Sequence, residues 1–212
     1  MLNIPIEEIN TWDRFYRANF INSLQGFKPV SLIGTVDAQG RPNLAVFSNI
    51  VHIGANPALI GFINRPVEAA PHTLGNIKAT LQYTINHILP SFVPAAHQSS
   101  AKFDKGINEF EQVGLTATWK EGSKAPYVAE SRVQYGLQLV EVVPITHNNT
   151  FLVIGTVTQV FLEEGLLRQD GFIDLDKAQS VASLGIDGYF FEGKVHRFEY
   201  ARPNKPVKEN NG

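Results

Sequence analysis

The chain has 212 residues, of which 43% are hydrophobic and 18% are charged. This composition excludes a disordered chain and a coiled coil, and the length suits one large domain. With 18 basic and 20 acidic residues the net charge is −2, so no overall positive field exists to hold nucleic acid or an anionic membrane. The absence of cysteine excludes disulfides, thiolate metal sites and thiol catalysis. Redox chemistry would therefore need a bound cofactor to carry the electrons.

The sequence carries no mark of export or membrane insertion. Its first residues show no basic segment followed by an apolar run, so we expect no signal peptide. No uncharged apolar stretch reaches the length of about 18 residues that a membrane-spanning helix needs. We therefore expect a cytoplasmic protein.

The first predicted element is a helix within residues 11–24, where aromatic and aliphatic side chains recur at helical spacing. Asn10 or Thr11 could cap its first turn, because both side chains accept hydrogen bonds from free backbone N–H groups. Residues 1–28 are accordingly predicted to be an N-terminal helical extension.

Short strands joined by turns dominate the rest of the chain. The clearest sign is a hairpin over 30–48, whose turn at 37–40 ends in a glycine that tolerates positive φ. Further strands are expected at 49–53, 58–63, 81–86, 132–143, 150–161 and 195–200, and short helices at 72–79, near 92, near 109 and at 174–180, where Asp174 could cap the first turn. Residues 88–131 form a long irregular excursion, and 201–212 are expected to be a flexible tail.

This order of elements predicts the fold class. Many short strands with hairpin turns and only one βα unit favour an antiparallel barrel or sandwich, mostly β with short helices. We expect residues 1–212 to form a single domain.

The sequence lacks the motifs of several common enzyme classes. No glycine-rich dinucleotide fingerprint, phosphate-binding Gly-Lys-Ser/Thr loop or Gly-x-Ser-x-Gly nucleophile elbow occurs. None of the six histidines lies three or four residues from another, so no two of them form a metal-binding pair on one helix face. No catalytic residue is identified, and no metal site is expected.

One stretch could bind a phosphate. Thr73 follows a proline at the start of the 72–79 helix, where free N–H groups and the positive end of the helix dipole favour an anion. Arg65 could add a charge-assisted contact, and Asn76 lies one turn further along the helix. The alternative is that Thr73 only caps the helix and that Arg65 is a solvated loop residue.

A second stretch could bind a flat ring. Ala45 and Ser48 are small residues where the second hairpin strand ends. Small side chains allow a ring to approach the backbone, whose N–H groups can meet the polar edge of the ring. The alternative is an ordinary strand end.

Several further motifs accompany these two stretches in order. The segment Asn-Leu-Ala-Val-Phe-Ser at 43–48 follows the acidic turn, Asn-Pro follows at 56–57, and Thr-Leu-Gly-Asn-Ile lies at 73–77. Weaker matches continue at 100–103, 109–110, 125–131, 184–190 and 200–203. In this order and spacing the motifs resemble the flavin reductase-like, FMN-binding split-barrel family, in a branch related to flavoredoxins.

The resemblance implies a split β-barrel that binds FMN at or near a homodimer interface, and the apolar residues of the 88–131 excursion favour such a dimer. It implies that the isoalloxazine ring and the ribityl chain lie along Asn43, Ala45, Phe47, Ser48 and Asn49, and that the phosphate lies at Thr73 and Asn76. The family usually has an acidic residue where this sequence has His72. The phosphate-binding cation is therefore open between Arg65, His72 and Lys78.

The implied function is that of a flavoprotein oxidoreductase. The resemblance implies an NAD(P)H-dependent flavin reductase or a flavoredoxin-like electron carrier, in which FMN supplies the redox chemistry and NADH or NADPH the electrons. A protein electron acceptor would be a further partner. Two alternatives stay open, a barrel that binds flavin without catalysis and a split-barrel oxidase of another substrate, such as pyridoxamine phosphate. The sequence distinguishes neither NADH from NADPH nor a tightly held flavin from a passing one.

Overall fold

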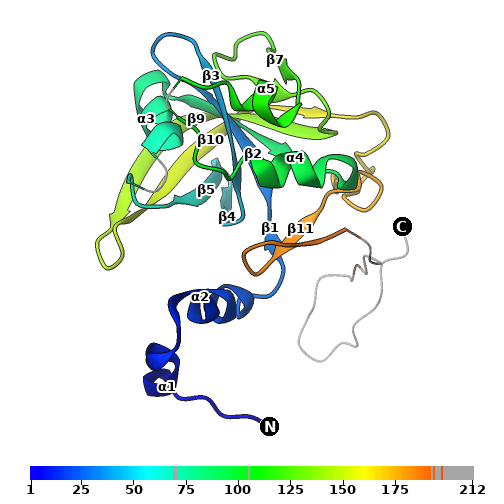
Figure 1. Ribbon diagram of the computed structural model, residues 1–212. Helices are drawn as coiled ribbons and strands as arrows, with labels where there is room; N and C mark the ends of the chain where they lie inside the picture. The colour runs from blue at the N-terminus through cyan, green and yellow to red at the C-terminus, as the bar shows by residue number, and fades with distance from the viewer. Residues whose placement is uncertain (69–70, 105, 192, 194–196, 198–212) are drawn as a thin grey trace.

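The computed structural model of the protein describes residues 1–68, 71–104, 106–191, 193 and 197. Figure 1 shows a curled β-sheet with helices packed around it, and two N-terminal helices that stand away from this body. The helices are α1 (Ile6–Thr11), α2 (Arg14–Ser23), α3 (Pro71–Thr80), α4 (Val93–Gln98) and α5 (Glu109–Val113), with a short 3-10 helix η1 (Pro90–Phe92). Within this described part of the chain, none of the helices is long and apolar enough to span a bilayer.

Seven strands form one antiparallel sheet in the order β3-β2-β6-β9-β10-β5-β4. They are β2 (Ser31–Val36), β3 (Pro42–Phe47), β4 (Ile50–Ala55), β5 (Ala58–Asn64), β6 (Gln82–His87), β9 (Val133–Ile145) and β10 (Thr150–Leu162). Two small sheets accompany it, one of β1 (Lys28–Pro29), β11 (Ala182–Leu184) and β12 (Gly188–Phe190), the other of β7 (Ala117–Thr118) and β8 (Tyr127–Val128). The predicted antiparallel, mostly β fold is confirmed.

The two edges of the main sheet are tied together. β3 and β4 lie at opposite edges, yet only Ser48 and Asn49 separate them in the chain. An extended chain covers at most about 3.5 Å per residue, so the sheet must curl until its edges meet at this connection. The resulting barrel is open along the seam between β3 and β4, which is the split barrel that the family resemblance implied.

β2 separates two hydrophobic cores. All six of its residues are buried, and successive side chains of a strand point to opposite faces. Leu32 packs in a core with Phe110 of α5, whereas Ile33 packs in a second core with Ile77 of α3. Burial on both faces explains why Leu32 and Ile33 are adjacent apolar residues instead of alternating with polar ones.

The helix predicted within residues 11–24 is α2, but the predicted cap is wrong. Asp13 caps this helix by accepting a hydrogen bond from the backbone N–H of Phe15 at 2.8 Å. Asn10 and Thr11 instead end the separate helix α1. An aspartate carboxylate at the N-terminus also interacts favourably with the helix dipole, which favours it over the two neutral residues.

The helix predicted at 174–180 is also wrong. The segment forms hydrogen-bonded turns, in which Asp174 still accepts from a backbone N–H at 3.1 Å. Gln179 has a φ of 56°, a left-handed conformation that ends any helical run. The strand predicted at 195–200 lies outside the described residues except for residue 197, and the tail 201–212 lies wholly outside them.

His87 at the end of β6 is expected to make stability depend on pH. Burial lowers the pKa of this histidine to about 4, whereas a histidine in the unfolded chain has a pKa of about 6.5. Between these values the unfolded chain binds a proton that the folded protein excludes. The free energy of unfolding should therefore fall as the pH drops from about 6.5 to about 4, by up to about 1.4 kcal/mol per pH unit from this group.

Urea unfolding at several pH values in this range measures the slope of the free energy of unfolding against pH. His87→Gln is the variant, and His52→Gln is the control. His52 is an exposed histidine on β4. The slope should become shallower in His87→Gln and stay unchanged in His52→Gln. The same slope in all three proteins would contradict a buried neutral His87.

Candidate functional site

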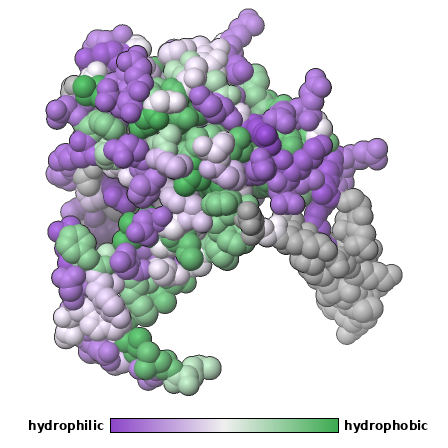
Figure 2. Space-filling view, turned by 45° about the vertical axis from the view of Figure 1, so that its right-hand side comes forward, coloured by the Kyte–Doolittle hydropathy of each residue, from purple (hydrophilic) through white to green (hydrophobic). Residues whose placement is uncertain are grey.

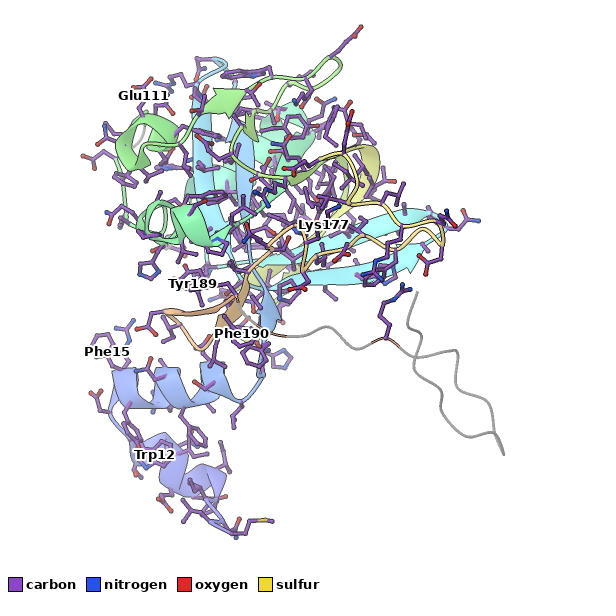
Figure 3. All side chains as sticks on the ribbon, turned by 90° about the vertical axis from the view of Figure 1, so that its right-hand side faces the viewer. Trp12, Phe15, Glu111, Lys177, Tyr189 and Phe190 are labelled. Atoms are coloured by element: carbon purple, nitrogen blue, oxygen red, sulfur yellow. The ribbon has the colours of Figure 1, made fainter. Side chains whose placement is uncertain are left out.

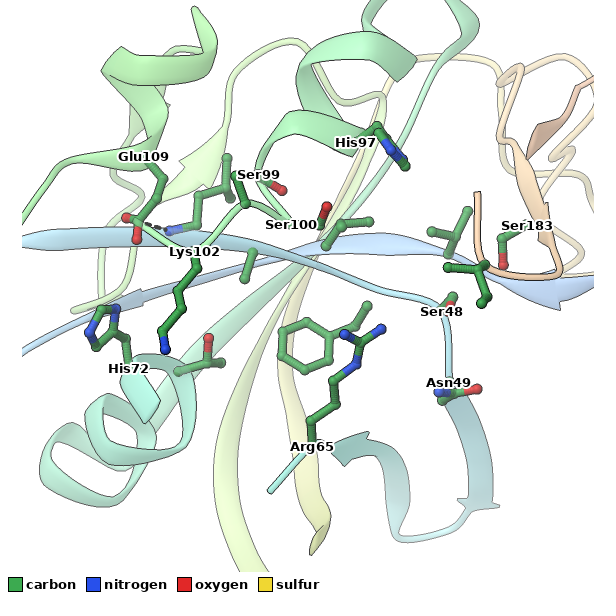
Figure 4. Close-up of a pocket in the computed structure, with 18 of the residues that line it drawn as sticks. Ser48, Asn49, Arg65, His72, His97, Ser99, Ser100, Lys102, Glu109 and Ser183 are labelled. Atoms are coloured by element: carbon green, nitrogen blue, oxygen red, sulfur yellow. Dashed lines mark hydrogen bonds between the residues drawn. The ribbon is translucent and has the colours of Figure 1, made fainter. Parts of the chain in front are cut away.

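A cavity of about 730 Å³ lies at the seam of the barrel. One wall is β3 with the connection to β4, and the facing wall is the loop 99–104 that follows α4 (Figure 4). The start of α3 borders one end, and the hairpin of β11 and β12 borders the other. The volume lies in the range of about 300–1,000 Å³ that small-molecule sites occupy.

The structure brings together nearly all of the residues that the sequence analysis proposed. The cavity is lined by Asn43, Ala45, Phe47, Ser48, Asn49, Arg65 and Thr73. Asn76 is not among the lining residues and instead donates to the hydroxyl of Thr35 at 3.0 Å. Of the three candidate cations, Arg65 and His72 line the cavity, whereas the ammonium group of Lys78 lies 5.5 Å from the ring centroid of Phe151.

A buried hydrogen-bond network joins β3 to α3 and α5 at one end of the cavity. The Asn43 amide donates from Nδ2 to Oε1 of Glu109 at 2.6 Å. Its Oδ1 accepts from the hydroxyls of Thr35 at 3.2 Å and Thr73 at 3.4 Å. Asn76 donates to Thr35, which leaves the proton of the Thr35 hydroxyl free to point at Asn43. Asn43 therefore holds the first turns of both helices against the strand.

Glu109 is a lining residue that the sequence analysis did not propose as a site residue. Its side chain is buried, and its second oxygen, Oε2, accepts from the backbone N–H of Leu44 at 3.3 Å. Burial raises the pKa of its carboxyl group, while the hydrogen bonds from β3 and the nearby His72 oppose that rise. Glu109 belongs to one of the weaker motifs, but nothing in that motif indicated contact with a strand 65 residues earlier.

Lys102 was also missed. Figure 4 shows its side chain reaching from the loop 99–104 toward His72 and the start of α3. The cationic side chain and the positive end of the helix dipole thus face the same end of the cavity, an arrangement that favours an anion. Lys102 could not be placed from the sequence, because the excursion 88–131 showed no regular pattern.

The other end of the cavity is less charged. Ala45 and Ser48 are half-buried there. Phe47 lines the cavity and also packs in the second core, where its ring centroid lies 4.9 Å from that of Phe62. At the rim, Nδ1 of His97 lies 3.1 Å from the hydroxyl of Tyr189, which ties α4 to the hairpin of β11 and β12. Among the residues that the structure describes, no group of three or more histidine and acidic side chains could hold a metal ion.

Comparison with known proteins agrees with this geometry. The sequence profile described as flavin reductase like domain matches residues 27–182. A split barrel protein from Shewanella frigidimarina NCIMB 400, assigned to the flavin reductases, is 44% identical with a TM-score of 0.91, over 95% of this chain and 100% of that chain.

Two more distant structures share the fold. Nitrilotriacetate monooxygenase component B from Bacillus cereus is 22% identical with a TM-score of 0.81, over 92% of this chain and 97% of that one. The flavoredoxin of Desulfovibrio vulgaris (Miyazaki F) is 24% identical with a TM-score of 0.71, over 84% and 92%. The resemblance read from the motifs is confirmed, and the chain belongs to the flavin reductase-like domain family of flavin-related oxidoreductases.

Proposed function

We propose that the protein is an NAD(P)H-dependent flavin reductase that binds FMN in the cavity between β3 and the loop 99–104. The observation that carries the proposal is the polarity of this cavity. One end combines the start of α3 with Thr73, His72 and Lys102, a donor set that suits a phosphate. The other end offers small side chains and backbone beside Ala45 and Ser48, which suits a flat ring.

Thr73 is well placed to bind the phosphate. Among the described residues, its hydroxyl donates one long hydrogen bond of 3.4 Å, to Oδ1 of Asn43. The hydroxyl can turn toward a phosphate oxygen at little cost, because Asn43 keeps its hydrogen bonds to Thr35 and Glu109. The network therefore keeps the cavity wall in place whether or not the phosphate is bound.

The basic side chains have separate positions along the cavity. Figure 4 shows His72 and Lys102 together at the α3 end and Arg65 nearer its middle. We assign the phosphate to His72 and Lys102, and the ribityl chain or ring edge to Arg65. Lys78, the third candidate from the sequence, lies against Phe151 instead.

Bound FMN would supply the hydride and electron chemistry, and the chain would bind, orient and partly shield it. Hydride transfer to flavin requires no acid or base from the protein. This fits a cavity in which the buried carboxyl group of Glu109 is already occupied by two hydrogen bonds from β3.

The proposed function is tested with purified protein loaded with FMN under anaerobic conditions. Addition of NADH or NADPH should bleach the visible absorption bands of the flavin, because the donor reduces it. A protein that binds FMN and is bleached by dithionite, but by neither nucleotide, would instead be a flavin-binding barrel or an electron carrier. Failure to bind FMN would overturn the assignment of the cavity.

Thr73→Ala tests the phosphate end. The variant should weaken FMN binding by about 1–3 kcal/mol and leave riboflavin binding unchanged, because riboflavin lacks the phosphate. Fluorescence titration with both flavins measures the two affinities. Thr80→Ala, at the far end of the same helix, is the matched control and should bind both flavins like the unmodified protein. Equal losses for both flavins in Thr73→Ala would mean that Thr73 acts only on the helix.

We further propose that the protein forms a homodimer through its N-terminal arm, residues 1–27. Figure 1 shows α1 and α2 standing away from the body, and α2 has no buried residue. Phe15 and Leu24 are 74% and 64% exposed, and Figure 3 shows Phe15 projecting clear of the body. Figure 2 shows hydrophobic side chains on the arm and on the face of the body above it. Exposed apolar surface of this kind is typical of a face that another chain covers.

Light scattering after gel filtration tests the dimer. The unmodified protein should show twice the chain mass of 23.5 kDa at micromolar concentration. Phe15→Glu should shift it to the monomer, because a charge would be buried in the contact. Leu167→Glu, at a position 61% exposed in the β-bridge with Ile173, is the control and should stay dimeric. An unmodified protein that is monomeric, or a dimeric Phe15→Glu variant, would contradict the proposal.

A further inference from the structure

We propose that Glu109 determines how the cavity recognises phosphate: binding of a phosphomonoester at the α3 end is coupled to uptake of one proton by the Glu109 carboxyl group. The inference rests on the proposed FMN site and deepens it. The coupling would distinguish flavins that carry a phosphate from flavins that do not.

Glu109 is fixed beside the phosphate end and cannot turn away from an incoming anion. Its side chain is only 4% exposed, and it lines the same cavity as Thr73, His72 and Lys102. Oε1 accepts from Asn43 at 2.6 Å, and Oε2 accepts from the Leu44 backbone at 3.3 Å. Both contacts come from β3, the central wall of the cavity, so the carboxyl group has a defined position in the free and the bound protein.

One amide group separates the carboxyl group from the proposed phosphate ligand. Asn43 donates to Glu109 with its nitrogen and accepts from Thr73 with its oxygen. A phosphate oxygen that accepts from the Thr73 hydroxyl would therefore lie on the far side of Asn43 from the buried Glu109 carboxylate. Two negative charges in adjoining parts of one cavity repel each other.

The charged groups that face Glu109 determine whether its carboxyl group stays ionised when a phosphate binds. β3 presents only the neutral Asn43 and Leu44, α3 presents His72, and the loop 99–104 presents Lys102 and Asp104. On α5 itself, Glu111 is occupied by a hydrogen bond from Asn108. Arg41, near Gly106, is engaged in an ion pair with Asp37. Among the residues that the structure describes, His72 is the cation that stabilises the Glu109 carboxylate, and it is also assigned to the phosphate together with Lys102.

A phosphate dianion would draw both cations to itself and leave the carboxylate uncompensated. Burial already raises the pKa of Glu109, and the phosphate adds to that rise, so the group takes a proton from solvent. Each carboxyl oxygen has two lone-pair positions, and β3 occupies one on each. A position therefore remains for the proton, and the neutral carboxyl group no longer repels the phosphate.

The coupling is reciprocal. If phosphate binding raises the proton affinity of Glu109, protonation of Glu109 raises the affinity for phosphate by the same factor. FMN affinity should therefore rise by up to about tenfold per unit fall in pH where the coupling is complete. Riboflavin affinity should show no such dependence. The second pKa of a phosphomonoester is about 6, so measurements above about pH 7 avoid titration of the ligand itself.

The test is calorimetric titration of the full chain with FMN and with riboflavin, in buffers of different ionisation enthalpy at about pH 7.5. The dependence of the measured heat on the buffer gives the number of protons taken up. FMN binding should take up protons and riboflavin binding should take up none. Equal proton numbers for the two flavins would overturn the coupling, without any variant being needed.

Two variants identify the group that takes the proton. Glu109→Gln should lose the uptake on FMN binding, and its riboflavin affinity reports whether the cavity is intact. Glu121→Gln, which removes an exposed acid outside the cavity, is the control and should keep the uptake. Uptake that persists in Glu109→Gln would assign the proton to another group, such as His72, and overturn the proposal. A protein that binds riboflavin but not FMN at any pH would overturn the proposed phosphate site itself.

Discussion

The two-residue link between β3 and β4 is the constraint on which the rest of the molecule depends. These strands are the opposite edges of a seven-stranded sheet, and Ser48 and Asn49 force the edges together at one point only. The sheet must curl, but it cannot close along its whole length. The cavity lies beside that connection, so one constraint both curls the sheet and positions the cavity with half-buried Ala45 and Ser48 in its wall.

Local patterns were sufficient to predict most of the fold. The hairpin over 30–48 and the strands that became β9 and β10 were readable because apolar runs alternate with turn residues there. The helix predicted at 174–180 failed because the left-handed φ of Gln179, which no propensity indicates, ends the turn early. The placement of α4 and α5 over β3 depends on contacts between distant segments, which periodicity does not encode.

The residues of the candidate site also divide into those that the sequence could predict and those that it could not. Residues on β3 and α3 could be proposed because each belongs to a short motif with a physical reason for its residue types. Glu109 and Lys102 could not, because the weaker motifs that contain them indicate no contact with β3 or α3. Asn76 shows the opposite case, since its side chain supports the wall through Thr35 instead of reaching the cavity. A motif thus predicts that a residue matters more reliably than it predicts what the side chain touches.

The burial of β2 on both faces has a consequence for local opening. To break the hydrogen bonds of this strand, the protein must expose two cores at once, so its amide protons should exchange with solvent only through global unfolding. The facing loop is different, because Ser99 is the only buried residue within 99–104. The cavity therefore lies between β3, which is paired with β2, and a largely exposed loop. A ligand can enter by a local opening of the loop while the wall that positions it stays folded.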